Sequence, residues 1–127
     1  NIQPGDEVIM PSYTFVSTAN AFVLRGARIV FADSTHENPN MDATNVESLI
    51  TANTKAIVPV HYAGIACEMG TLKEISSKYD IAIIEDAAQA IDSFHNEQPL
   101  GSLGSMSAFS FHETKNIISG EGGMLVI

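Results

Sequence analysis

The sequence predicts an α/β fold with a mainly parallel sheet flanked by helices. Apolar runs of strand length alternate along the chain with segments of helical pattern, which is typical of right-handed βαβ units. Residues 81–84 are apolar at consecutive positions, as in a parallel strand that is buried on both faces. The 127 residues, 45% of them hydrophobic, are enough for one domain with a substantial core.

The strands are predicted from short apolar runs bounded by turn-forming residues. The first run follows a turn at residues 4–6, and Pro59 weakens the third because proline cannot donate to a sheet. The expected strands are residues 8–10, 27–32, 56–60, 81–84 and 107–111, with a further apolar segment at 125–127. Ligands of such sheets bind beyond the carboxyl ends of the strands, so the polar residues that follow each strand are the candidates for a functional site.

The helices are predicted from apolar periodicity and from residues that favour helix ends. Ser12 or Thr14 would cap the first helix and Asp42 the second, because a side-chain oxygen can accept from the free backbone N–H groups there. Gly26 would end the first helix. The expected helices run to about Arg25, over residues 43–50 and over residues 69–79.

Charge and cysteine content exclude several classes of function. Six Lys and Arg residues against fifteen Asp and Glu give a net charge of −9, which argues against nucleic acid or an anionic membrane as the partner. The single cysteine, Cys67, cannot form an internal disulfide, and no apolar run is long enough to cross a membrane, so a cytoplasmic location is expected. The four histidines lack paired metal-ligand spacing, and no metal site is predicted.

Two acidic residues directly follow the fourth predicted strand. Glu85 and Asp86 would be poorly solvated there unless they met a cation or a hydrogen-bond donor. A carboxylate beside a pyridine nitrogen keeps that nitrogen protonated, which pyridoxal phosphate (PLP) needs in order to act as an electron sink. Gln89 could donate a hydrogen bond to the same ligand. The alternative for these acids is a metal ligand or a helix N-cap.

Lys115 differs from the other three lysines because it alone follows a predicted strand in the ligand-binding position. A PLP enzyme needs an amine that loses its proton easily in order to form a Schiff base. The hydroxyl of Ser110, five residues before Lys115, could bind a phosphate. The alternative is a solvated lysine in a surface loop. The glycines of residues 120–123 lack the G-x-G-x-x-G spacing, which argues against an NAD-dependent dehydratase or epimerase.

Seven stretches, spread over essentially the whole chain, have the order and spacing of the motifs of one enzyme family. They are Gly5-Asp6-Glu7-Val8, Pro11-Ser12-Tyr13-Thr14-Phe15, Pro59-Val60-His61-Tyr62-Ala63-Gly64, Glu85-Asp86-Ala87-Ala88-Gln89-Ala90, Leu100-Gly101-Ser102-Leu103-Gly104, Phe109-Ser110-Phe111-His112-Glu113-Thr114-Lys115-Asn116 and Gly120-Glu121-Gly122-Gly123. In this highly specific combination they resemble the DegT/DnrJ/EryC1/StrS sugar aminotransferases, which are PLP enzymes. The resemblance implies the central part of the large domain of the aspartate-aminotransferase (type I PLP) fold.

The resemblance implies a role toward PLP for each matching residue. Lys115 would form the internal aldimine and move the proton between substrate and cofactor. Asp86 would pair with the pyridinium nitrogen, and Gln89 would face the ring or its phenolic oxygen. Ser110 would bind the phosphate, and Phe15 would stack on the ring with its flat apolar face.

The resemblance also implies a substrate class. The run around Lys115, together with residues 11–22, is most similar to the dTDP-4-amino-4,6-dideoxygalactose transaminase branch. That branch aminates dTDP-4-keto-6-deoxyglucose with glutamate on the way to enterobacterial common antigen. Tyr13 and His61 would lie near the sugar. Some family members are dehydratases with histidine in place of the lysine, so lysine favours transamination. The alternative is a non-catalytic ligand-binding or regulatory domain on the same fold.

The resemblance further implies that residues 1–127 are one fragment of the PLP-binding large domain. A phosphate-binding segment rich in Gly, Ser and Thr is expected before Asn1, and a small C-terminal domain is expected beyond the chain. Family members are dimers with sites shared across the interface, so a homodimer is expected for the full-length protein.

Overall fold

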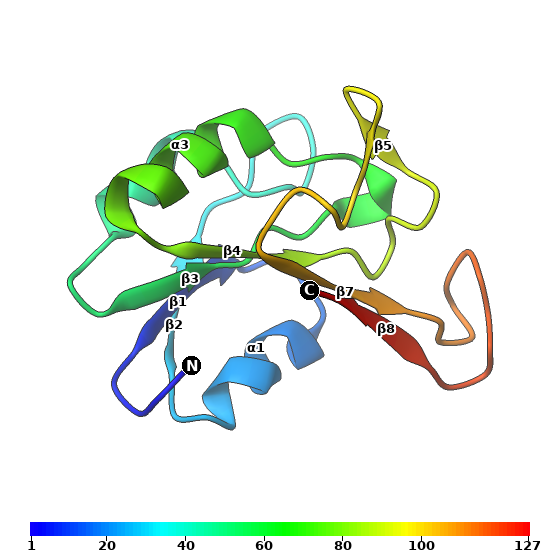
Figure 1. The fold of residues 1–127 in the computed structure, drawn as a ribbon, viewed down its shortest axis with the longest axis horizontal. Coiled ribbons are helices and arrows are strands. Elements are labelled where there is room, and N and C mark those ends of the chain that lie inside the picture. Colours follow the sequence, from blue (N-terminus) through cyan, green and yellow to red (C-terminus); the bar gives the residue numbers. More distant parts are fainter.

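A six-stranded sheet forms the centre of the computed structural model, which describes residues 1–127 (Figure 1). The strand order is β2-β1-β3-β4-β7-β8, and only β8, at one edge, runs antiparallel to its neighbour. The strands are β1 (Glu7–Pro11), β2 (Arg28–Ala32), β3 (Thr54–Ile57), β4 (Ala82–Asp86), β7 (Met106–Ser110) and β8 (Gly123–Val126). The predicted α/β fold with a mainly parallel sheet is confirmed.

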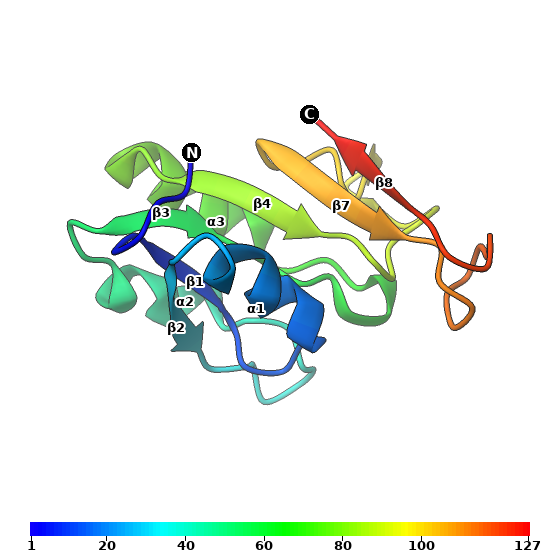
Figure 2. The ribbon, with the colours of Figure 1, turned by 90° about the horizontal axis from the view of Figure 1, so that it is seen from below.

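Helices cover both faces of this sheet, as Figures 1 and 2 show. The helices α3 (Met69–Tyr79) and α2 (Ala43–Val46) lie on one face, and α1 (Val16–Val23) lies on the other. A small hairpin of β5 (Phe94–His95) and β6 (Gln98–Pro99) lies in the connection from β4 to β7. None of the helices combines the length and the apolarity that crossing a membrane requires.

Each face of the sheet has its own apolar cluster. In β1, Ile9 packs into a cluster of 16 buried residues on the α2 and α3 side, whereas Val8 and Met10 belong to a cluster of 5 on the α1 side. In β4, Ile83 belongs to the larger cluster and Ile84 packs against the smaller one. Because successive side chains of a strand point to opposite faces, a strand between two helical layers is apolar at consecutive positions.

The first helix differs from its prediction at both ends. The residue before α1 is Phe15, which makes no side-chain capping bond, so the caps predicted at Ser12 or Thr14 are wrong. The hydroxyl of Thr14 instead lies 2.9 Å from that of Thr18, one turn along the helix. The helix also ends before the predicted Arg25.

The second helix is shorter than predicted, although its cap is confirmed. Oδ1 of Asp42 accepts a hydrogen bond from the N–H of Thr44 at 3.0 Å. After α2 the chain tightens into a 3-10 turn (Glu47–Leu49) in place of the continuous helix expected over residues 43–50. The third helix has the predicted bounds.

The fourth strand extends further than predicted at its carboxyl end and includes Glu85 and Asp86. Backbone bonds continue the ladder on both sides, since the N–H of Asp86 donates to the carbonyl of Pro59 at 2.9 Å and the N–H of Ala87 donates to that of Ala108 at 2.9 Å. The two acids are therefore strand residues, and their side chains point to opposite faces of the sheet.

Candidate active site

The carboxyl ends of β1 and β4 border a pocket of about 320 Å³. Its lining comes from the segments that follow these strands, from the segment after β3 and from the β7–β8 connection. The lining residues are Ser12, Tyr13, Thr14, Phe15, Val60, His61, Tyr62, Asp86, Ala88, Gln89 and Lys115. Of the residues predicted for the site, only Ser110 is absent from this lining.

Lys115 lies in the connection between β7 and β8, which leaves the sheet and returns to it. Backbone bonds close the neck of this loop, because the N–H of Phe111 donates to the carbonyl of Gly122 at 2.8 Å and the N–H of Ser119 donates to that of Phe111 at 2.9 Å. Within the loop, the N–H of Lys115 donates to the carbonyl of His112 at 2.9 Å. The half-buried Lys115 side chain lines the pocket, where its amine can meet a ligand.

The carboxylate of Asp86 is held from two sides. The hydroxyl of Thr18, in α1, donates to Oδ2 at 2.6 Å, and the N–H of Ala88 donates to Oδ1 at 3.1 Å. The side chain thus crosses from the end of β4 toward α1 and borders the pocket with a fixed orientation. A fixed carboxylate of this kind can hold a cationic group of a ligand.

Aromatic and amide side chains form much of the remaining wall. Phe15 is 73% exposed, so its flat face is free to stack on a planar ring. Oε1 of Gln89 accepts from the N–H of Ala63 at 2.7 Å, which leaves the amide NH₂ group as a donor. The hydroxyls of Tyr13 and Tyr62 lie 3.4 Å apart, and this hydrogen bond raises the pKa of Tyr62. The phenol of Tyr62 is therefore protonated at neutral pH.

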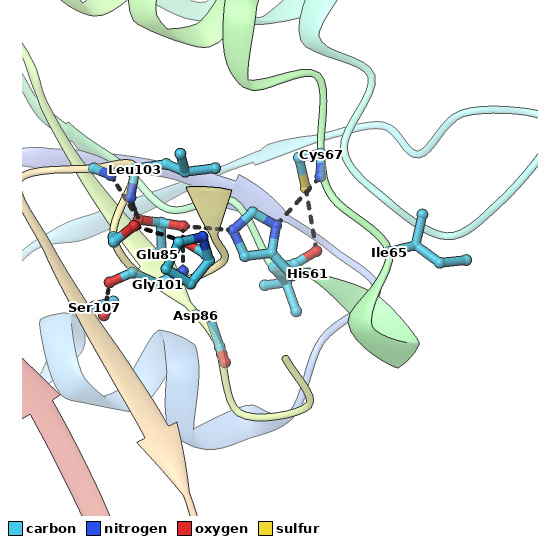
Figure 3. Close-up of polar contacts among 12 residues, drawn as sticks. His61, Ile65, Cys67, Glu85, Asp86, Gly101, Leu103 and Ser107 are labelled. Carbon is cyan, nitrogen blue, oxygen red and sulfur yellow. Dashed lines mark hydrogen bonds and ion pairs between the residues drawn. The ribbon is translucent and has the colours of Figure 1, made fainter. Parts of the chain in front are cut away.

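Glu85 lies beneath the site, with no exposed surface, in a network of hydrogen bonds (Figure 3). Its Oε2 lies 2.8 Å from Nε2 of His61 and accepts from the N–H of Gly101 at 2.8 Å. Its Oε1 accepts from the N–H groups of Leu103 and Gly104, both at 2.6 Å. Burial alone raises the pKa of Glu85, but the hydrogen bonds from His61, Gly104 and Gly101 outweigh it and lower the pKa below its ordinary value.

His61 does not have the position expected of a substrate contact. Its ring is fully buried, and both ring nitrogens are engaged, since Nδ1 accepts from the N–H of Cys67 at 3.2 Å while Nε2 meets Glu85. The thiol of Cys67 donates to the carbonyl of Val60 at 3.2 Å, and burial raises its pKa to about 12. In this arrangement the His61 ring supports Glu85 from within the core behind the pocket wall.

Ser110 is the last residue of β7 and does not line the pocket. Ala108, two residues earlier, is the register partner of Asp86, so Ser110 faces the same side of the sheet as Asp86. Its Oγ accepts from the N–H of His112 at 3.4 Å.

Sequence reasoning missed Thr18 and the separate environments of the two acids. The four-residue spacing of Thr14 and Thr18 was the available signal that their hydroxyls meet where the helix begins. The tandem acids gave no such signal, because their division between the two faces depends on the strand continuing through Asp86.

A lysine, a carboxylate, an amide and an exposed aromatic face meet in one pocket at the carboxyl ends of a parallel sheet. This donor set fits PLP, which offers an aldehyde, a basic ring nitrogen, a phenolic oxygen and a flat face. Together with the sheet, it fits the class of PLP-dependent aminotransferases. The chain belongs to the DegT/DnrJ/EryC1/StrS aminotransferase family, which matches residues 1–127. Aminotransferases of this family use PLP.

Individual relatives agree with this assignment. The spore coat polysaccharide biosynthesis protein SpsC of Bacillus subtilis is 44% identical over 124 residues, which are 98% of this chain and 32% of SpsC. The structure of Spr1654 from Streptococcus pneumoniae in its PLP form matches with a TM-score of 0.93 at 34% identity, covering 98% of this chain and 36% of that one. DesV from S. venezuelae matches with a TM-score of 0.93 at 38% identity, covering 98% and 34%. The chain thus spans about a third of the length of these relatives.

Proposed function

We propose that this chain is part of the PLP-binding large domain of a nucleotide-sugar transaminase. The observation that supports this function best is the convergence of Lys115, Asp86, Gln89 and Phe15 on one pocket. These residues come from three separate stretches of the sequence, and each offers a group that PLP chemistry requires.

Each residue has a distinct task in the proposal. PLP, when bound, supplies the electron sink for amino transfer. Nζ of Lys115 attaches the cofactor and carries the proton during transfer, while the Asp86 carboxylate holds the protonated ring nitrogen. Phe15 stacks on the ring and Gln89 donates to its phenolic oxygen. Ser110, on the same side of the sheet as Asp86, binds the phosphate after a rotation of its hydroxyl toward the pocket.

The proposed substrates are L-glutamate as amino donor and a dTDP-4-keto-6-deoxy-hexose whose C4 keto group accepts the amine. The motif around Lys115 supports this choice. SpsC is named for spore coat polysaccharide biosynthesis, which supports a product used in a cell-surface polysaccharide such as enterobacterial common antigen. Tyr13, 53% exposed at the pocket, and its partner Tyr62 offer hydroxyls that can bind those of a sugar.

The full-length protein is proposed to act as a cytoplasmic homodimer. Large apolar side chains remain exposed near the pocket and along β8, which is consistent with a surface that another part of the protein or a second subunit covers. They are Phe15, Val16, Ile117, Ile118, Met124 and Leu125. The free thiol of Cys67 is compatible with a reducing compartment. Light scattering on the full-length protein tests the dimer directly.

The test of the function uses the full-length protein with PLP, glutamate and dTDP-4-keto-6-deoxyglucose. We expect a change in the visible absorbance of bound PLP with glutamate, formation of 2-oxoglutarate, and an aminated nucleotide sugar by mass spectrometry. Borohydride reduction followed by peptide mapping should locate the PLP label on Lys115.

The matched control is the pair Lys115→Ala and Lys73→Ala. Lys73 is exposed on α3 and does not line the pocket, so its substitution should leave amino transfer unchanged. Lys115→Ala should abolish turnover and the borohydride label. Normal turnover by Lys115→Ala would refute the proposed function. If the wild-type protein binds PLP but transfers no amino group, the non-catalytic alternative is favoured.

A further inference from the structure

We propose that Thr18 is a positioning residue that, with Thr14, orients the Asp86 carboxylate toward the cofactor. The inference rests on the proposed function, in which Asp86 holds the ring nitrogen of PLP. It assigns a task to a hydroxyl that lies outside the pocket lining and that the sequence analysis gave no role.

The direction of the hydrogen bonds follows from the chemistry of the groups. An ionised carboxylate only accepts, so the hydroxyl of Thr18 must give its single hydrogen to Oδ2 of Asp86 across the 2.6 Å contact. Thr18 can then only accept from Thr14, whose Oγ1 lies 2.9 Å away. The two hydroxyls form a chain directed from Thr14 through Thr18 to Asp86, in which each bond polarises the next.

The two hydrogen-bonded hydroxyls determine which acceptor positions of Asp86 remain for a ligand. Two carboxylate oxygens offer about four lone-pair positions. One on Oδ2 is taken by Thr18 and one on Oδ1 by the N–H of Ala88. Because both oxygens are held, the plane of the carboxylate is fixed, and its remaining positions border the pocket that Lys115 also lines.

The helix that carries Thr18 is itself fixed against the sheet. On α1, Ala19 and Phe22 pack against the smaller apolar cluster, which includes Val8 and Met10 of β1. The hydroxyl of Thr18 therefore reaches Asp86 from a rigid element. Without it, the carboxylate would keep only the bond from the N–H of Ala88 and could rotate away from the ring nitrogen.

The test measures PLP affinity of the full-length protein by equilibrium titration, followed through the visible absorbance of the bound cofactor. Thr18→Val keeps the branched shape but removes the donor, and we expect about tenfold weaker PLP binding, the scale of one hydrogen bond to a charged group. Thr18→Ser restores the donor and should restore affinity to within about twofold of the wild type. Ser17→Ala, at an exposed neighbouring position of α1, is the matched control and should change nothing.

A double-mutant cycle with Asp86→Asn separates positioning from a general loss of stability. If Thr18 acts through Asp86, Thr18→Val should have little further effect on PLP affinity once the carboxylate is gone, whereas a merely structural role would remain additive. Thermal melts of the apoprotein measure the structural effect separately. If Thr18→Val does not fold, Thr14→Val tests the same series of hydrogen bonds by removing its first donor. We then expect PLP affinity to fall about threefold.

The outcomes distinguish this inference from the proposed function. Weaker PLP binding by Thr18→Val, rescue by Thr18→Ser and a non-additive cycle support it. Unchanged binding by Thr18→Val, while Asp86→Asn binds PLP much more weakly, overturns the inference and leaves the proposed function intact. If Asp86→Asn also binds PLP normally, the role of Asp86 in the proposed function fails, and the inference fails with it.

Discussion

The imidazole of His61 and the carboxylate of Glu85 lie 2.8 Å apart, and neither side chain has any exposed surface. The N–H of Cys67 donates to Nδ1 of His61, so that nitrogen carries no hydrogen and Nε2 is the donor to Glu85. The pair is thus a hydrogen bond from Nε2 of His61 to the buried carboxylate of Glu85. It joins the segment after β3 to the end of β4, immediately before the Asp86 of the candidate site.

Replacing Glu85 with alanine is the strongest single disruption that we expect in this network. The change leaves the N–H groups of His61, Gly101, Leu103 and Gly104 without their acceptor. We expect the free energy of unfolding to fall by about 3–5 kcal/mol. Urea denaturation measures it, and Glu74→Ala on the exposed side of α3 is the control, with an expected change of less than about 0.5 kcal/mol. Equal effects of the two substitutions would contradict this role for Glu85.

The same carboxylate makes stability depend on pH. Its pKa is lower in the folded state than in the unfolded chain, where it is about 4.3. The stabilisation that Glu85 provides is therefore complete above that value and is lost as the pH falls through the folded pKa. We expect Glu85→Gln to be less stable than the wild type at neutral pH, with the difference shrinking as the pH falls below about 4. Urea denaturation across this pH range measures the difference. A stability difference that stayed the same at every pH would show that the ionisation of Glu85 does not contribute to it.

Gly101 should be intolerant of a side chain. Its φ of +86° is in the left-handed region, and an added Cβ would meet Cζ of Phe109 and lie 2.6 Å from Cε2 of the same ring. We expect Gly101→Ala to cost about 2–4 kcal/mol of unfolding free energy, from the backbone conformation and from overpacking. Gly70, on α3, has nothing within 4 Å of an added Cβ, and Gly70→Ala should be neutral or slightly stabilising. Thermal unfolding of both variants checks the contrast, which would fail if Gly101→Ala melted like the wild type.

The sequence predicted the sheet well because its signals were local. The consecutive apolar residues of β4 and the apolar face of α3 identify a strand and a helix without any tertiary information. The cap at Asp42 was predictable for the same reason. The caps at Ser12 and Thr14 were wrong because α1 begins only after Phe15, and the hydroxyl of Thr14 meets that of Thr18 instead of a free backbone N–H.

The environment of each site residue depended on contacts between distant segments. His61 and Tyr13 follow strands in the same way, yet His61 turns into the core toward Glu85 and Tyr13 remains at the pocket. Nothing in the residues around His61 distinguishes these outcomes, since its partner lies 24 positions away. Sequence position alone therefore identified the end of the sheet that holds the site, and tertiary contacts decided which side chains face it.

Cys67 should be unreactive in the native protein and become reactive only on unfolding. The residue is 1% exposed, and its thiol donates to the carbonyl of Val60 and has its pKa raised by burial to about 12, so both access and thiolate formation are suppressed. We expect labelling by iodoacetamide at neutral pH to be at least about 100-fold slower in the native state than in urea, as followed by mass spectrometry. Because the N–H of Cys67 bonds to His61, Glu85→Ala should accelerate labelling by loosening the ring that accepts this bond, whereas Glu74→Ala should not. Rapid labelling of the native wild type would show that the segment after β3 opens without global unfolding, and the buried pair would then not hold it closed.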